Sequence, residues 1–134
     1  ETGSATLSPK TIIIAWDGSM EAARAVHSAR PILQAAQSVR VVLVDPVAGD
    51  AGQGGEPGAD IAAYLARLGV PVTVDRLPSG GKPVADVLIQ HARDHAAEMI
   101  VMGAYGHSRL RERIFGGVTR SMLNGVQVPL FMAH

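Results

Sequence analysis

A glycine-lined segment near the C-terminus has the residue spacing with the clearest chemical potential. An apolar run over residues 99–102 ends at Gly103, and further glycines follow at Gly106, Gly116 and Gly117, directly before a stretch of helical character. Backbone N–H groups in such a loop, together with the positive end of a helix dipole, hold anions and most often phosphates. Glycines at these positions would also suit a purely structural loop, since they tolerate positive φ. The spacing therefore indicates either a phosphate-binding loop or a structural connection between a buried strand and a helix.

The glycine spacing resembles the nucleotide-binding motif of the universal stress protein family. That motif is a glycine, two residues, a glycine, nine residues and a third glycine followed by Ser or Thr. This chain matches the glycines of the motif at Gly103, Gly106 and Gly116, and the resemblance extends over residues 10–134. One position departs from the motif, because Gly117 stands where the nucleotide-binding members have Ser or Thr.

The resemblance implies a site for an adenine nucleotide, namely ATP with or without Mg²⁺. Asp17, which follows the first predicted strand, matches the aspartate that contacts the nucleoside in the family. Its alternative role is to help Ser19 cap the helix that follows. Ala15 and Asp45 would lie near the adenine and act mainly through backbone groups. The residues that the resemblance assigns to the site are Ala15, Asp17, Asp45, Met102, Gly103, Gly106, Gly116, Gly117, Val118 and Thr119.

The departure at Gly117 leaves two functions open. A hydroxyl that donates to a charged phosphate contributes about 1.5–3 kcal/mol. Because about 1.4 kcal/mol is a tenfold change in affinity, its loss would move micromolar binding toward tenths of a millimolar or weaker. One function is a nucleotide-binding sensor or regulatory domain in a stress response. The alternative is an interaction or dimerisation domain with the same fold and a degraded pocket.

The chain offers no recognisable catalytic apparatus and only a weak metal-binding pattern. His91 and His95 stand four residues apart on a predicted helix, which is the spacing of two metal ligands. No third ligand is evident in the sequence, so we interpret them as exposed histidines near Asp94 and predict no metal site. No nucleophile with a neighbouring base and no carboxylate pair in a perturbing context is visible, so no catalytic residue is assigned. Slow ATP hydrolysis is the most that the resemblance would allow.

Alternating strand and helix patterns position these residues. The segments at about 10–16, 39–44 and 99–103 are largely apolar, without alternation, which is typical of strands buried on both faces of a parallel sheet. The half-polar run 70–77 suits an edge strand, and 128–133 is the fifth predicted strand. Strands that alternate with helices predict an α/β fold with an open parallel sheet and helices on both faces, which is Rossmann-like. The resemblance implies the strand order 3-2-1-4-5.

The predicted helices are bounded by their own local signals. Pro31 falls inside the first helix and is expected to kink it without ending it. Gly69 suits the C-terminal cap of the second helix, and Pro83 suits the first turn of the third. These helices cover about residues 20–36, 59–68 and 83–97.

Composition narrows the class of protein. The 134 residues are enough for one domain with a hydrophobic core, and we expect a flexible tail over residues 1–9 before a domain at 10–134. The 12 basic and 12 acidic side chains cancel, which argues against a nucleic-acid or anionic-membrane binder. There is no cysteine, so disulfides and cysteine metal sites are excluded. No apolar run is long enough to span a membrane, and a cytoplasmic domain is expected.

The last predicted strand, 128–133, creates a sheet edge that needs a partner. The resemblance implies an antiparallel homodimer through this strand, or its pairing with a sister domain in a tandem protein. The alternative is that residues 1–9 cover the edge. The chain begins at Glu1, which agrees with the C-terminal half of a tandem protein as one source.

Overall fold

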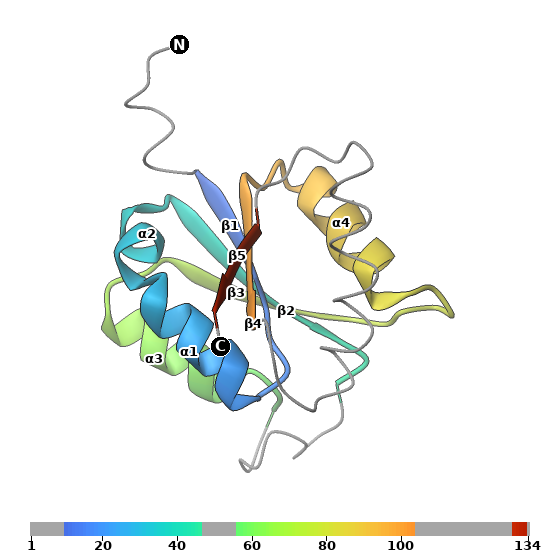
Figure 1. The fold of residues 1–134 in the computed structure, drawn as a ribbon, viewed down its shortest axis with the longest axis horizontal. Helices are drawn as coiled ribbons and strands as arrows, with labels where there is room; N and C mark the ends of the chain where they lie inside the picture. Colours follow the sequence, from blue (N-terminus) through green and yellow to red (C-terminus); the bar gives the residue numbers. More distant parts are fainter. Residues whose placement is uncertain (1–9, 47–55, 104–129, 134) are drawn as a thin grey trace.

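A computed structural model describes residues 10–46, 56–103 and 130–133 of the chain. In these residues five strands form one parallel sheet in the order β3-β2-β1-β4-β5 (Figure 1). The strands are β1 (Thr11–Ala15), β2 (Ser38–Val44), β3 (Val72–Leu77), β4 (Met99–Gly103) and β5 (Leu130–Ala133). The predicted α/β class with a parallel sheet is confirmed. β3 is shorter than predicted, because residues 70 and 71 complete the connection from the preceding helix.

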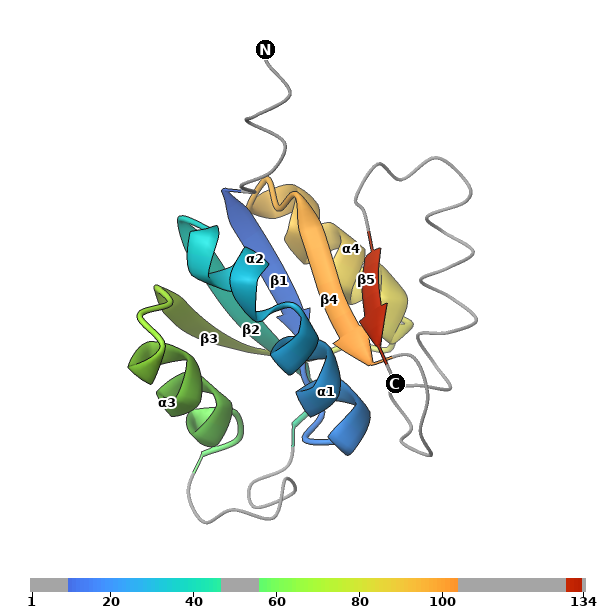
Figure 2. The same cartoon turned by 60° about the vertical axis from the view of Figure 1, so that its left-hand side comes forward.

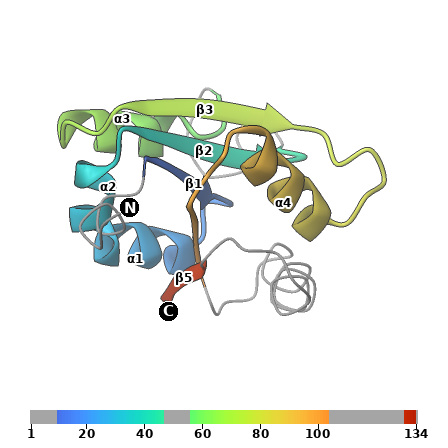
Figure 3. The same ribbon diagram turned by 90° about the horizontal axis from the view of Figure 1, so that it is seen from above.

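The helices lie on both faces of the sheet, as predicted. They are α1 (Met20–Ser28), α2 (Arg30–Ala35), α3 (Ala59–Arg67) and α4 (Val84–Asp94). Figure 3 shows α1, α2 and α3 on one side of the sheet and α4 on the other. The chain moves outward from β1 to β3 through the first three helices and then returns through α4 to β4. Strand order therefore reverses at β1, between its neighbours β2 and β4.

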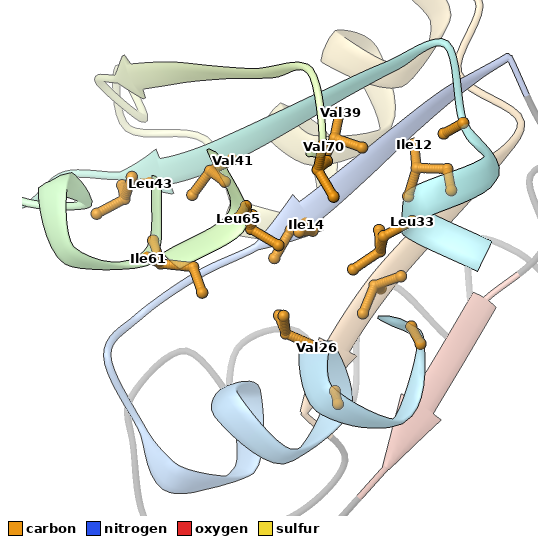
Figure 4. Close-up of a cluster of buried hydrophobic side chains, with 14 residues drawn as sticks. Ile12, Ile14, Val26, Leu33, Val39, Val41, Leu43, Ile61, Leu65 and Val70 are labelled. Atoms are coloured by element: carbon orange, nitrogen blue, oxygen red, sulfur yellow. The ribbon is translucent and has the colours of Figure 1, made fainter. Parts of the chain in front are cut away.

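β1 is buried on both faces because its apolar run contains no polar position. Ile12 and Ile14 pack toward α1, α2 and α3, Ile13 packs toward α4, and all three side chains are fully buried. The cluster on the α1–α3 face is the larger of the two (Figure 4), and its labelled members are Ile12, Ile14, Val26, Leu33, Val39, Val41, Leu43, Ile61, Leu65 and Val70. β1 is thus held rigidly between two hydrophobic layers, which fixes the residues that follow it.

The helical connection from β1 to β2 is broken, whereas the sequence predicted a kinked continuous helix. Ala29 separates α1 from α2, and Pro31 lies in the first turn of α2. Pro31 has no N–H to donate to the carbonyl of His27, and its ring clashes with that carbonyl in a continuous helix. The break at Ala29 removes this conflict.

α4 also differs from its predicted extent, because it ends before residue 97 in a Schellman motif. Ala96 takes a left-handed conformation at φ +53°. Its N–H donates to the carbonyl of Arg93 at 3.2 Å, and the N–H of Ala97 donates to the carbonyl of Ala92 at 2.8 Å. Gly69, at φ +82°, has the equivalent position after α3 and closes that helix as predicted.

Within the described residues, the helices are all too short or too polar to cross a lipid bilayer. β5 pairs with β4 and is the terminal strand of the sheet.

Candidate functional site

The carboxyl ends of β1 and β4 meet where the strand order reverses. Ile14 of β1 pairs with Val101 of β4, so the last residues of the two strands run side by side. Figure 2 shows these strand ends beside α1, on the same edge of the sheet as the end of β5. In open parallel sheets, ligands bind in the crevice outside such strand ends.

Half of the predicted nucleotide-site residues lie in the described part of the chain. Ala15, Met102 and Gly103 are at the ends of β1 and β4, Asp17 follows β1, and Asp45 follows β2. The topology thus gathers these five at one edge of the sheet. The other predicted residues, Gly106, Gly116, Gly117, Val118 and Thr119, lie outside the described residues.

Asp17 organises the turn that starts α1. Its Oδ1 accepts a hydrogen bond from the Ser19 N–H at 2.9 Å. The Ser19 hydroxyl oxygen then accepts from the Ala22 N–H at 3.1 Å, so Ser19 is the N-cap that the sequence predicted. Gly18 between them has φ +79°. The capping role for Asp17 is therefore present in the structure, and its partly buried carboxylate lies just after the end of β1.

Gly103 allows the end of β4 to contact the first turn of α1. A Cβ atom at this position would lie 2.7 Å from the carbonyl carbon and the Cβ of Glu21 and 2.8 Å from the Ala22 nitrogen. Contacts that short do not occur between real side chains and backbone. The absence of a side chain at Gly103 is thus a packing requirement, which the motif alone does not reveal.

Ala15 and Met102 have side chains committed to the core. They are 1% and 2% exposed and belong to the hydrophobic cluster on the α4 face. Any contact that these two residues make with a ligand must therefore come from their backbone groups. Trp16, by contrast, packs partly buried against the cluster on the α1–α3 face.

Asp45 links the end of β2 to the loop after β3. It has φ +53°, its N–H donates to the carbonyl of Leu77 at 2.8 Å, and its Oδ1 accepts from the Ser79 N–H at 2.9 Å. This residue is exposed. Its carboxylate thus orders the start of the connection from β3 to α4, next to the end of β2.

A second polar cluster, which the sequence did not predict, lies between α4 and strands β2 and β3. Asp75 Oδ2 is 2.7 Å from His91 Nε2 and 2.9 Å from Arg40 Nη1. The rings of His91 and His95 are 4.4 Å apart between centroids. His91 is therefore not the exposed residue that we expected, because its side chain is only 13% exposed and that of Asp75 is 16% exposed.

The charge states in this cluster are set by burial and by the neighbouring groups. Burial by itself raises the pKa of the Asp75 carboxyl, but the hydrogen bonds and the charges of His91 and Arg40 together outweigh burial and leave that pKa below its usual value. Desolvation lowers the pKa of His95, and the charges of Arg40 and His91 lower it further. An ionised carboxylate thus lies beside a His95 imidazole that favours its neutral form.

The doubly wound parallel sheet, with its strand-order reversal at β1 and helices on both faces, defines a Rossmann-like α/β domain. A model of the universal stress protein family matches residues 9–134. The chain therefore belongs to the universal stress protein family and is a stress-related domain of that family.

The individual proteins that resemble this chain have low sequence identity to it or match only a short part of it. The universal stress protein Slr1230 of Synechocystis sp. is 31% identical over 45 residues, which is 34% of this chain and 16% of that protein. A universal stress protein structure from Archaeoglobus fulgidus has a TM-score of 0.63 at 21% identity, covering 92% of this chain and 43% of that one. A universal stress protein in complex with cAMP has a TM-score of 0.59 at 20% identity, covering 95% and 98%. The alignments span less than half of each of the first two relatives, and the structures show a shared fold.

Proposed function

We propose that this domain binds an adenine nucleotide, with ATP as the expected ligand, and acts as a sensor or regulatory module in a stress response. One observation carries the proposal: the end of β4 at Gly103 abuts the first turn of α1, beside the Asp17 turn, at the reversal of strand order. The crevice outside these strand ends is the position where sheets of this kind bind nucleotides. Membership of the family and the cAMP in a relative of the same fold support an adenine ligand.

Asp17 is the described side chain best suited to recognise the nucleoside. A ribose offers hydroxyl donors, and a carboxylate accepts such hydrogen bonds more strongly than a neutral group does. Asp17 Oδ1 already accepts from Ser19, and this bond holds the carboxylate in a fixed orientation. The phosphates would then be held by backbone N–H groups of the glycine segment after β4, as the motif implies.

The second candidate function is an interaction domain that binds no nucleotide. Gly117 favours it, because the chain lacks the hydroxyl that nucleotide-binding members place after the third glycine of the motif. In that case the domain would act through the edge of its sheet. We propose for both functions that β5, the terminal strand, pairs with a second copy or with a sister domain.

The test is a calorimetric titration of the chain with Mg-ATP, beside Asp17→Asn and Asp17→Ala. Asn keeps an Oδ1 acceptor for the Ser19 N–H and removes only the charge, so the turn should persist. We expect the natural chain to bind, and Asp17→Asn to bind about fivefold more weakly, as for a loss of about 1 kcal/mol. Asp17→Ala should lose affinity and helix stability together. Equal affinity of all three chains for Mg-ATP would refute a role for Asp17 in binding.

Gly117→Ser distinguishes the two candidate functions. If the pocket works without the hydroxyl, the natural chain binds and Gly117→Ser binds on the order of tenfold more tightly or better. If only Gly117→Ser binds, the natural domain has a pocket disabled at one residue, and the interaction function is supported. Gly103 is unsuitable for such a test, because any side chain there collides with α1.

A further inference from the structure

The polar cluster between α4 and strands β2 and β3 brings together one carboxylate and two imidazoles, which are common metal ligands. We propose that Asp75, His91 and His95 form a binding site for a divalent transition metal ion, with Zn²⁺ as the ion that best suits these ligands. The site uses none of the residues assigned to the nucleotide, so it stands independently of the proposed function.

The geometry brings the three ligand atoms within reach of one ion. One ligand atom from each of Asp75, His91 and His95 can be chosen so that all of them lie within 4.8 Å of one another. Ligands at about 2.0–2.2 Å around a tetrahedral Zn²⁺ ion are about 3.3–3.6 Å apart. The 2.7 Å between Asp75 Oδ2 and His91 Nε2 is a hydrogen bond, and small side chain rotations would open it to admit the ion.

The fold explains why these residues meet. Asp75 pairs in register with Val42 of β2, and Val42 belongs to the core on the α4 face. The next helix along the chain is α4, which packs on that same face. His91 lies in the last turns of α4 and His95 is its C-cap residue, so the two imidazoles project from one helix face near Asp75. α4 thus supplies two ligands through the spacing of its histidines, and β3 supplies the third.

The ligand set selects the class of ion. Imidazole with carboxylate suits zinc and other late first-row metals, whereas Mg²⁺ and Ca²⁺ prefer shells made of oxygen. Three protein ligands leave a fourth tetrahedral position for water. Binding at His91 Nε2 requires the neutral imidazole with its proton on Nδ1, and the bond to the ion then replaces the hydrogen bond between Nε2 and Asp75 Oδ2.

Arg40 moderates the affinity of the site. Its Nη1 is 2.9 Å from Asp75 Oδ2, so its positive charge opposes a cation at this oxygen while its hydrogen bond orients the carboxylate. Hydrogen-bonded carboxylates are common among metal ligands. The Arg40 charge therefore weakens metal binding, and its removal should strengthen it.

The experiment is thermal unfolding of the tag-free, nucleotide-free chain with and without ZnCl₂. We expect Zn²⁺ to raise the unfolding midpoint saturably, because an ion bound only to the folded state stabilises it, and Mg²⁺ to have no such effect. His91→Gln, which keeps a side chain amide donor for Asp75, and His95→Gln should lower Zn²⁺ affinity on the order of tenfold or more. His27→Gln, at an exposed histidine of α1, should leave Zn²⁺ affinity unchanged.

Direct binding measured with Co²⁺ keeps the test valid if a variant is unstable. Tetrahedral Co²⁺ absorbs visible light, so the spectrum reports the ion itself, and Zn²⁺ should displace it. Arg40→Gln should bind Zn²⁺ more tightly than the natural chain does. The proposal is overturned if no saturable binding occurs, if His91→Gln and His95→Gln bind like the natural chain, or if His27→Gln alone loses the effect.

Discussion

Gly103 is required to be glycine for two separate reasons, one in the family motif and one in the packing of the fold. The family motif places a glycine there, and the packing of β4 against α1 independently excludes any side chain, because a Cβ would lie 2.7 Å from Glu21 atoms. Part of the motif is therefore structural. The glycine sets how closely α1 can approach the end of β4.

A substitution at Gly103 should be costly even without ligand. We expect Gly103→Ala to lower the free energy of unfolding by about 1–3 kcal/mol, because the new methyl group forces α1 away from β4. Urea unfolding of the ligand-free chain measures this. Gly69→Ala is the control, because its position has open space within 4 Å and positive φ, and it should cost only about 1 kcal/mol. Equal losses at the two positions would contradict the close-packing account.

At the scale of single residues, sequence predicted the turn but not the second polar cluster. Asp17 and Ser19 have types that cap helices, and their roles follow from local spacing alone. Asp75 gives a weaker signal, because an acidic residue in a half-polar strand usually faces solvent. Only the crossover from β3 to α4 brings it to His91, and that contact depends on how two elements pack. The alternation in β3, combined with paired histidines on the next helix, is the signal that could have revealed it.

The element that links the candidate site to the rest of the fold is α1. Its N-terminus is fixed by Ser19 and its first turn contacts the end of β4. Ser19→Ala should therefore lower the free energy of unfolding by about 1 kcal/mol, because the Ala22 N–H loses its acceptor. Chemical denaturation checks this, with Ser28→Ala at the other end of α1 as the control, expected to change stability by less than about 0.5 kcal/mol. Similar effects of the two substitutions would argue against the cap.

The strands and helices were predicted best from the sequence where their side chains are fully buried. β1 and β4 have unbroken apolar runs, so their strand character and central positions follow from hydropathy alone. The ends of elements were harder to predict. Pro31 breaks the first helix because a backbone conflict outweighs the apolar pattern that continues through it, and Ala96 ends α4 in a left-handed conformation that usually calls for glycine.

At the scale of the whole molecule, β5 is the last strand of the sheet, so we expect its outer edge to pair with another strand. If a second copy pairs with β5, amide protons of residues 130–133 should exchange more slowly at high protein concentration than at low concentration. The reason is that strand pairing between copies would place the outward N–H groups of β5 in hydrogen bonds. Hydrogen exchange at two concentrations, with sedimentation equilibrium for mass, tests this. Amides of β3, the opposite edge strand, are the internal control and should not respond. A monomeric mass with concentration-independent exchange in β5 would refute pairing between copies.

An NMR titration of the isotope-labelled chain with Mg-ATP tests most directly whether an adenine nucleotide binds where β1 and β4 end, as we propose. We predict saturable shifts, with a dissociation constant up to about 1 mM, that concentrate at the amides of residues 15–19 and at Gly103. Amides around His91 should shift little. Absence of saturation at about 5 mM nucleotide, or saturable shifts confined to other parts of the sheet, would contradict the account.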